Sequence, residues 1–163
     1  MNHQDIPVTN AVRVLREHGI SFIPHVYGYE EHGGTRHSAE ALGVSEHLVV
    51  KTLVFVTDRK EPLIVLMHGD REVSAKGLAR AINVKRTEPC DERTAHRLTG
   101  YLFGGTSPFG TRTRLPVYVE KTIFELEKIF INGGKRGFLV EIQPEAIRRL
   151  LPVKEVTVAT LAG

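Results

Sequence analysis

A glycine-rich segment at residues 104–110, GGTSPFG, is the first candidate for chemistry in this sequence. Its glycines leave the backbone bare, so a substrate could approach main-chain N–H groups able to bind a carbonyl or an oxyanion. A plain turn, in which the glycines take positive φ and Pro108 stiffens the chain, explains the same residues. Common phosphate-binding motifs are excluded. Neither this segment nor residues 131–137, INGGKRG, matches the Walker pattern GxxxxGK[ST], and the dinucleotide pattern GxGxxG is absent from the sequence.

Lys51 interrupts a nearly continuous apolar run, VVKTLVFV at residues 49–56, which is typical of a central strand buried on both faces. A lysine is almost never fully buried without a partner. Lys51 therefore either points into a cleft or carries its ammonium out at the end of the strand, and both alternatives stay open. Thr52 faces the opposite side of such a strand, where β propensity alone would explain it.

Other reactive side chains do not form a recognisable catalytic or metal-binding pattern. Cys90 comes directly before Asp91, a typical helix N-cap, and is expected to be an unreactive loop thiol. Ser107 lies in GTSPF rather than in the GxSxG motif of serine hydrolases. His32 and His37 flank a loop with no third ligand in view, and no HExxH motif occurs. The sequence therefore predicts no metal site and no cofactor.

The elements that must position these residues are short helices and short strands. Strands come in clusters, without regular alternation of strand and helix, so we expect an α+β domain with a mixed, mostly antiparallel sheet of about six or seven strands covered by short helices. Pro24 restricts its strand to a sheet edge or to an irregularity in the sheet. The expected helices are residues 10–19, 37–43, 74–82, 91–100, 121–127 and 144–151, and the expected strands are 20–29, 47–58, 62–69, 84–88, 101–103, 115–120, 128–133 and 137–142.

The chain length suits one domain with a real core, so residues 1–163 are expected to form a single domain. No apolar run approaches the ~20 residues that span a bilayer, and the first residues, MNHQDIPVTN, lack the features of a signal peptide. The single cysteine excludes an internal disulfide and fits a reducing compartment, so a cytoplasmic protein without membrane contact is expected. The net charge of +3 favours a nucleic-acid partner only weakly.

Three segments together resemble the YbaK family of aminoacyl-tRNA deacylases, which is related to the editing domain inserted in bacterial prolyl-tRNA synthetase. They are VVKTLV at 49–54, TGYLFGGTSPFGTRTRLPVYVE at 99–120 and INGGKRG at 131–137. The resemblance extends from about residue 10 to about residue 153. It includes a Lys-Thr pair on a central strand and a GxxxP loop, here Gly104 to Pro108.

The resemblance implies the editing-domain fold and hydrolysis of the ester that joins a wrong amino acid to the 3′ end of a tRNA, usually tRNA(Pro), without metal or cofactor. It assigns catalysis to Lys51 and Gly104. Lys51 would place positive charge near the terminal adenosine or its phosphate and orient the ester, while the glycine loop would hold the substrate against main-chain amides. The substrate-binding residues that it implies are Tyr27, Thr52, Gly105, Thr106, Ser107, Pro108, Asn132 and Leu139.

Two positions depart from the cysteine-specific members of that family. Those relatives tend to carry a serine where this chain has Asn132, and an acid where it has Leu139. Loss of the carboxylate and gain of apolar bulk put a preference for cysteine in doubt, so alanine or another small amino acid becomes a candidate. Leu139 is equally consistent with a plain strand residue, because alternation places it opposite Phe138 and Val140.

Lys135 and Arg136 are expected at the tip of a tight turn, where they either contact the tRNA backbone or are simply solvated. We therefore expect a deacylase acting in trans on mischarged aminoacyl-tRNA, most simply cysteine or another small residue such as alanine on tRNA(Pro). Prolyl-tRNA synthetase is a candidate partner. Two alternatives remain open, a non-catalytic tRNA-binding or regulatory module that keeps the editing fold, and a hydrolase of small esters or nucleotides unrelated to tRNA.

Overall fold

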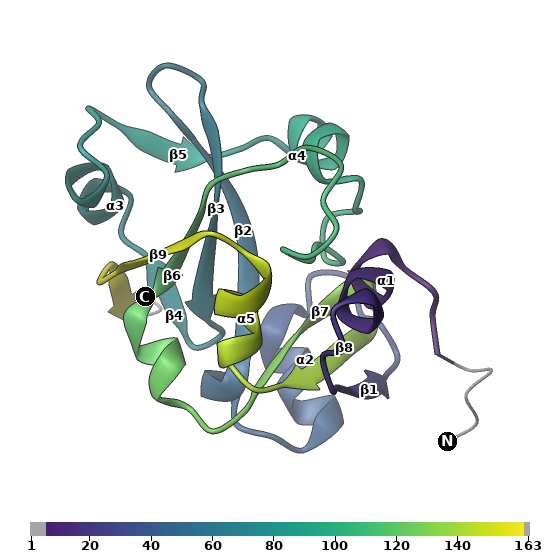
Figure 1. Ribbon diagram of the computed structural model, residues 1–163. Coiled ribbons are helices and arrows are strands. Elements are labelled where there is room, and N and C mark those ends of the chain that lie inside the picture. The colour runs from purple at the N-terminus through teal and green to yellow at the C-terminus, as the bar shows by residue number, and fades with distance from the viewer. Residues whose placement is uncertain (1–5, 162–163) are drawn as a thin grey trace.

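The computed structural model describes residues 6–161, and a large mixed β-sheet is its centre (Figure 1). The strands of this sheet are β1 (Ile23–Val26), β2 (Val49–Thr57), β3 (Pro62–His68), β5 (Thr87–Pro89), β6 (Val117–Glu120), β7 (Ile129–Lys135), β8 (Phe138–Ile142) and β9 (Val153–Val156). Their order is β1-β8-β7-β2-β3-β6-β9, and β5 also pairs with β2. The fold class is the predicted one, although this part of the chain forms an eight-stranded sheet rather than six or seven strands.

Antiparallel pairs predominate, as expected. They join β1 to β8, β7 to β8, β2 to β3 and β2 to β5, whereas β2/β7, β3/β6 and β6/β9 are parallel. The strand that carries Pro24 lies at the sheet edge, as predicted. A small second sheet pairs β4 (Arg71–Val73) with β10 (Ala159–Leu161). Strands β4, β9 and β10 were not predicted, because they are short and charged residues interrupt the apolar pattern in β4 and β9.

Helices form where caps and periodicity predict them. They are α1 (Asn10–Glu17), α2 (Gly34–Leu42), α3 (Ala75–Ala81), α4 (Glu92–Thr99) and α5 (Glu145–Leu150), with 3-10 turns η2 (Glu46–Leu48) and η3 (Lys121–Glu125). The side chains of Thr9, Ser74 and Asp91 accept backbone N–H bonds at the starts of α1, α3 and α4. Helix α2 begins at Gly34 rather than His37, and the helix expected at residues 121–127 is the 3-10 turn η3.

The predicted strand at residues 101–103 is wrong. Helix α4 ends at Gly100, whose φ is +81°, and the chain then bends instead of extending. Tyr101 turns inward, and its hydroxyl donates a 2.5 Å hydrogen bond to the carbonyl of Phe109. Leu102 and Phe103 stay exposed. An apolar triplet resembles a strand in the sequence, but these residues have no neighbouring strand to pair with.

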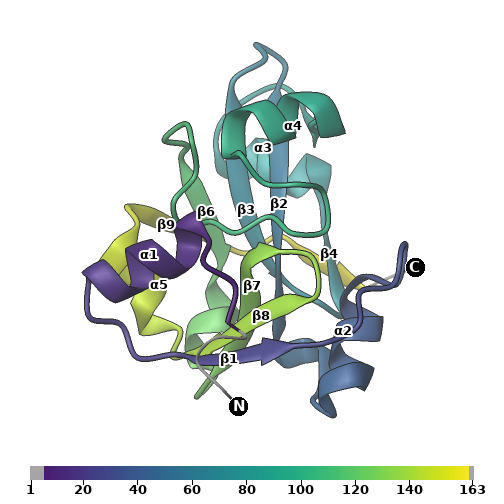
Figure 2. The ribbon, with the colours of Figure 1, turned by 90° about the vertical axis from the view of Figure 1, so that its right-hand side faces the viewer.

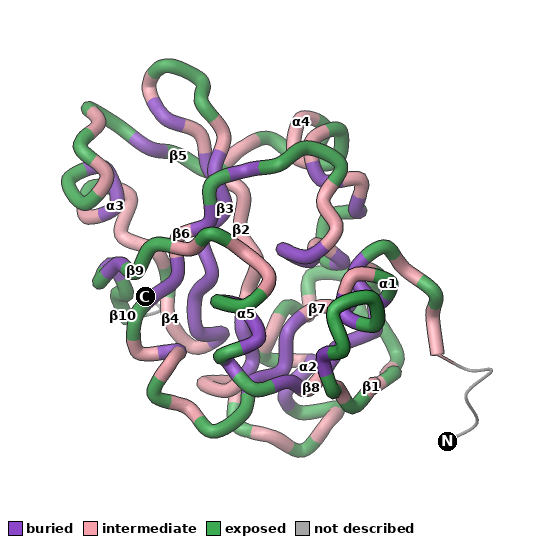
Figure 3. Tube along the Cα trace, in the orientation of Figure 1, coloured by how far each residue is buried: buried purple, intermediate pink, exposed green. Residues whose placement is uncertain are grey.

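Many of the buried residues lie on the central strands (Figure 3). The two faces of the sheet carry different apolar clusters. One face packs against α1 and α5, and Val50 and Val54 of β2 lie in or against its cluster. The opposite face carries two separate apolar clusters. Leu53 packs towards α3, whereas Val49 packs towards α2. Lys51 lies between these two residues on the same face of the strand, so it occupies the gap between the clusters.

Candidate active site

Lys51 is half-buried within the paired part of β2, where it lies opposite Met67 of β3. Burial lowers the pKa of its ammonium, and the negative charges of Glu72, Glu46 and Asp70 oppose that shift. No carboxylate oxygen of the described residues lies within 4.0 Å of Lys51 Nζ. The side chain therefore combines partial dehydration with the lack of a contact ion pair. Such a cation is available to an anionic or carbonyl ligand.

Asn132 of β7 shares the face of Lys51. Val49 pairs with Phe130 across the parallel β2/β7 ladder, and both lie in the cluster next to α2. Two residues further along each strand, Lys51 and Asn132 point to that same side. Leu139 of β8 lies opposite Asn132 and is 4% exposed in the same cluster, which confirms the face predicted for it by alternation.

Tyr27 borders this face where the chain leaves β1. Its hydroxyl and the Ser38 hydroxyl of α2 form a 2.8 Å hydrogen bond, and its N–H donates to the carbonyl of Gly137 at 2.9 Å. The ring packs against the cluster that contains Leu139. Tyr27 is thus fixed between α2 and the β7–β8 hairpin, next to the apolar cluster on the Lys51 face of the sheet.

The Asn132 side chain joins the β7–β8 hairpin to the glycine loop. Its Oδ1 accepts the N–H groups of Gly134 and Lys135, at 2.7 and 3.1 Å, within the bulge that precedes the hairpin turn. Its Nδ2 donates to the carbonyl of Gly104 at 3.1 Å. Segments far apart in the sequence thereby meet beside Lys51, and Figure 2 shows the chain after α4 descending towards the hairpin tip.

The glycines of the loop are required by the protein's own packing. Gly104 has a φ of +88°, and a Cβ there would lie 2.8 Å from the hydroxyl oxygen of Tyr29. A Cβ on Gly105 would lie 2.8 Å from the backbone nitrogen of Arg136. The loop therefore lies in close contact with the hairpin turn, and larger residues would push the two apart.

Main-chain donors in this loop remain free. Gly105 N–H donates to the carbonyl of Leu102 at 2.8 Å, but the N–H groups of Gly104 and Thr106 donate to no acceptor within residues 6–161. Gly104 is exposed. Unused N–H groups held in a fixed loop are the kind of donor that stabilises an oxyanion.

Ser107 and Pro108 anchor the loop from inside. Ser107 is fully buried, and its hydroxyl oxygen accepts the N–H of Phe109 at 3.1 Å. Pro108 is also buried, beside the core residue Phe109. In this arrangement Ser107 supports the loop and does not present its hydroxyl to solvent, so the structure offers no serine nucleophile here.

Comparison with known proteins identifies the family of this chain. The model of a family described as aminoacyl-tRNA editing domain matches residues 32–150. A relative from Enterococcus faecalis, EbsC, is 32% identical over 143 residues, covering 87% of each chain. The chain belongs to the aminoacyl-tRNA editing domain family. EbsC is provisionally named a Cys-tRNA(Pro)/Cys-tRNA(Cys) deacylase.

The chain is also similar to part of a larger enzyme and to solved structures of about its own length. The proline–tRNA ligase of Streptococcus equi subsp. zooepidemicus is 29% identical over 100 residues, which cover 61% of this chain and 16% of the ligase. A solved structure provisionally described as a trans-editing enzyme for prolyl tRNA synthetase has a TM-score of 0.78 at 20% identity, covering 96% of this chain and 100% of the other. The hypothetical protein APE2540 has a TM-score of 0.81 at 20% identity, covering 93% and 100%. These two structures support the fold of the editing domain.

Thr52 lies outside the group of residues around Lys51. It belongs to the opposite face of β2, next to Val50, and its hydroxyl is buried without a hydrogen-bond partner among the described residues. The structure therefore does not bring Thr52 to the Lys51 side of the editing domain. Its unpartnered hydroxyl has no physical account in the structure.

Lys135 and Arg136 are both exposed at the hairpin tip of the editing domain, but their contacts differ. Arg136 Nε donates to the carbonyl of Phe103 at 2.8 Å, and its guanidinium lies over the Tyr29 ring, 5.2 Å from the centroid. Lys135 Nζ has no carboxylate oxygen within 4.0 Å in the described part of the chain. Arg136 thus holds the glycine loop, whereas Lys135 is free to contact a phosphate.

Sequence reasoning missed the residues that surround Lys51 electrostatically. Glu46, Asp70 and Glu72 come from η2, the β3–β4 turn and β4, so no local motif could bring them together. Tyr29, which contacts Gly104, was also missed. The pattern YGY at residues 27–29 was the only hint of it in the sequence.

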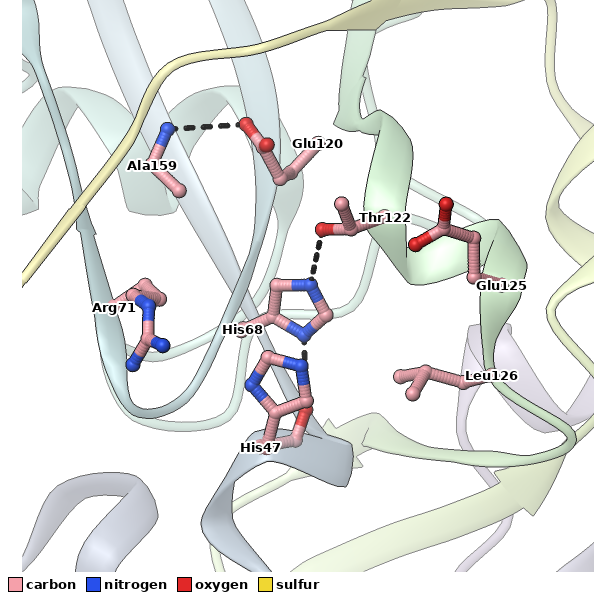
Figure 4. Close-up of a pocket in the computed structure, with 8 residues that line it drawn as sticks. All are labelled: His47, His68, Arg71, Glu120, Thr122, Glu125, Leu126 and Ala159. Atoms are coloured by element: carbon pink, nitrogen blue, oxygen red, sulfur yellow. Dashed lines mark hydrogen bonds between the residues drawn. The ribbon is translucent and has the colours of Figure 1, made fainter.

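A polar cavity of about 300 Å³ lies apart from the predicted site residues (Figure 4). His68 donates through Nδ1 to the carbonyl of His47 at 2.9 Å and accepts through Nε2 from the Thr122 hydroxyl at 2.7 Å. Burial lowers its pKa, in agreement with a neutral ring. His47 stacks on it and hydrogen-bonds to Asp70 at 2.8 Å. This network fixes η2, η3 and the β3–β4 turn, and thereby positions the Asp70 charge near Lys51. The cavity is lined by His47, His68, Arg71, Glu120, Thr122, Glu125, Leu126 and Ala159.

Other reactive groups add little to the site. Burial and the neighbouring Asp91 raise the pKa of the Cys90 thiol, which disfavours the thiolate. Within residues 6–161, no group of three or more His, Cys, Asp or Glu side chains is arranged to hold a metal ion. None of the helices in that range combines the length and apolar character needed to cross a bilayer.

Proposed function

We propose that this protein is an aminoacyl-tRNA deacylase that acts in trans and removes a small amino acid, cysteine or alanine, from tRNA(Pro). The observation that carries the proposal is the unpaired, half-buried ammonium of Lys51 on the sheet face where Asn132 holds Gly104. Family membership and the named activity of EbsC support the same reaction.

In the proposed reaction, a hydroxyl-bearing nucleophile, most simply water, adds to the ester carbonyl. The resulting oxyanion is stabilised by the free N–H groups of Gly104 and Thr106. Collapse of this intermediate breaks the bond to the ribose oxygen, which takes up the proton that the added water gives up. The free amino acid and the free 3′ end of the tRNA are then released. Lys51 supplies positive charge that orients the ester and the adjacent terminal nucleotide. An ester is already activated compared with an amide, so positioning and charge stabilisation suffice.

Selectivity for a small amino acid is proposed to come from Leu139 and Tyr27. Leu139 belongs to the almost fully buried apolar cluster beneath the Lys51 face, and Tyr27 is fixed beside that cluster by its bond to Ser38. An apolar surrounding of this kind favours cysteine or alanine over charged side chains. Discrimination between these two rests on little more than one sulfur atom, and a pocket gains only about 1–3 kcal/mol from a methylene-sized difference.

The test is deacylation of Cys-, Ala-, Ser- and Pro-tRNA(Pro) and of Cys-tRNA(Cys) by the wild type, Lys51→Ala and the exposed control Lys154→Ala. We expect fast loss of Cys- or Ala-tRNA(Pro), sparing of Pro-tRNA(Pro), and loss of activity only in Lys51→Ala. Because burial lowers the pKa of Lys51, its charge is lost at lower pH than that of an ordinary lysine, so the enzymatic rate should fall on the alkaline side after subtraction of spontaneous hydrolysis. If no ester is cleaved in single turnover while tRNA still binds, the protein is a non-catalytic tRNA-binding module.

A further inference from the structure

Three large apolar side chains are exposed beside the glycine loop. Leu102 and Phe103, 56% and 60% exposed, directly precede Gly104, and Tyr29, 40% exposed, contacts Gly104 from the other side. We call this surface, formed by Tyr29, Leu102 and Phe103, the aromatic ledge. Exposed apolar residues scattered singly need no explanation, but a group next to a site points to a ligand.

The aromatic ledge is held rigidly. The carbonyl of Leu102 accepts from Gly105 N–H at 2.8 Å, that of Phe103 from Arg136 Nε at 2.8 Å, and that of Gly104 from Asn132 Nδ2 at 3.1 Å. Three successive carbonyls are thus fixed by hydrogen bonds. The exposed rings therefore belong to an ordered surface, and a ligand that stacks on them needs to order little of the backbone.

The charges around the aromatic ledge suit a polyanion. Lys135 is exposed and unpaired at the adjoining hairpin tip, and Arg136 keeps its guanidinium over Tyr29. Residues 101–114 and 132–138, which form the loop and the tip, contain no acidic residue. The acidic residues that follow Tyr29 in the sequence are Glu30 and Glu31, and Glu30 is 3.0 Å from a ring nitrogen of His37.

We propose that the aromatic ledge binds the unpaired bases just upstream of the esterified nucleotide, with a base stacked on Phe103 and packed by Leu102, and Lys135 contacting a phosphate. This inference rests on the proposed function, since it assumes a tRNA 3′ end at Gly104. Aromatic rings combined with cations are the usual means of binding single-stranded RNA, because every base offers a π face and every linkage a charge. A protein partner would need a larger apolar area than three side chains provide.

The first test compares two esters of the same amino acid, the full aminoacyl-tRNA and the 3′-aminoacyl-adenosine, which lacks the upstream nucleotides. The variants are Phe103→Ala, Phe103→Trp and Leu102→Ala, with Leu161→Ala as a control that is also exposed and apolar. For Phe103→Ala we expect KM for the aminoacyl-tRNA to rise about 5- to 150-fold with little change in kcat, as expected for loss of one stacked base. Phe103→Trp should restore KM, and hydrolysis of the adenosine ester should not change.

Two outcomes overturn the aromatic ledge as a binding surface. One is an unchanged KM for aminoacyl-tRNA in Phe103→Ala, and the other is an equal loss on the adenosine ester, which would indicate a distorted loop. A second measurement is independent of hydrolysis: binding of a short single-stranded RNA ending in CCA. Wild type should bind it, and Phe103→Ala should bind more weakly, even if the wild type cleaves no ester and the proposed function fails. Equal binding by both proteins, or none by the wild type, would refute the inference.

Discussion

Substitution of Asn132 tests how the glycine loop is anchored, because this side chain forms hydrogen bonds to both the β7 bulge and the loop. Its Oδ1 accepts two N–H groups of the β7 bulge, and its Nδ2 donates to Gly104 of the glycine loop. Asn132→Ala removes all three hydrogen bonds. Asn132→Asp keeps an acceptor for the bulge but loses the donor to Gly104. The pair of variants therefore separates stability of the hairpin from anchoring of the loop.

The expected magnitudes follow from the bonds that are lost. Each neutral hydrogen bond contributes about 0.5–1.5 kcal/mol, and partial exposure of this group favours the lower half, so the loss of three bonds in Asn132→Ala should destabilise the protein by about 1.5–3 kcal/mol. For a chain of this length that lowers the melting temperature by roughly 3–12 °C. Asn132→Asp loses one of these bonds and should melt only about 1–4 °C below the wild type. If the anchored loop positions the ester, loss of this bond should reduce kcat/KM by about 2- to 5-fold.

A carboxylate at position 132 also adds negative charge on the face of Lys51. That charge would raise the pKa of Lys51 and move the alkaline fall in rate to higher pH. A misplaced loop instead lowers the plateau of kcat/KM without moving this limb. We would therefore measure deacylation as a function of pH for both variants, beside thermal melting. A plateau for Asn132→Asp equal to that of the wild type would refute the idea that the bond to Gly104 matters for catalysis.

Two further predictions concern buried polar groups. Ser107→Ala leaves the buried N–H of Phe109 without its acceptor. We therefore expect the free energy of unfolding, measured in urea, to fall by about 1–3 kcal/mol, and kcat/KM per folded molecule to stay unchanged. A total loss of activity in folded protein would instead make Ser107 a nucleophile. For His68, whose pKa is lowered by burial in the folded state, the unfolded chain binds the proton more readily, so stability should fall as the pH drops below about 6.5. In His68→Gln, the free energy of unfolding should fall less between about pH 7.5 and about pH 5.5, whereas the exposed control His32→Gln should behave like the wild type. Identical pH slopes of stability in all three proteins would contradict a neutral, buried His68.

Much of the fold could be predicted from local features. The Asp91 cap marked the start of α4, and two apolar runs, one of them around Lys51, predicted the strands β2 and β3. The predictions failed where pairing with another strand determines the local structure. Residues 101–103 have the composition of a strand but lack a partner strand, while β9 has a polar composition and pairs because β6 lies beside it.

The candidate site, too, could be predicted from local features only in part. The sequence singled out Lys51 because a charge within an apolar strand is costly, and the glycine loop because its backbone is bare. It could not show that Arg136 holds the loop, because the bond joins positions 33 residues apart along the chain. Nor could it show that the glycines make room for Tyr29 and the hairpin. These contacts depend on the register of the β7–β8 bulge, which no local pattern defines.

The surroundings of Lys51 explain how a strand lysine can remain both charged and available. Burial alone would favour the neutral amine, and a contact ion pair would restore the charge but occupy the ammonium. Here Glu46, Asp70 and Glu72 raise its pKa from a distance, with none of their oxygens within 4.0 Å of Nζ. The gap between the two apolar clusters provides the space for this arrangement. Removing one of these carboxylates should therefore lower the pKa of Lys51 further and narrow the pH range of activity, without removing any direct contact of the lysine.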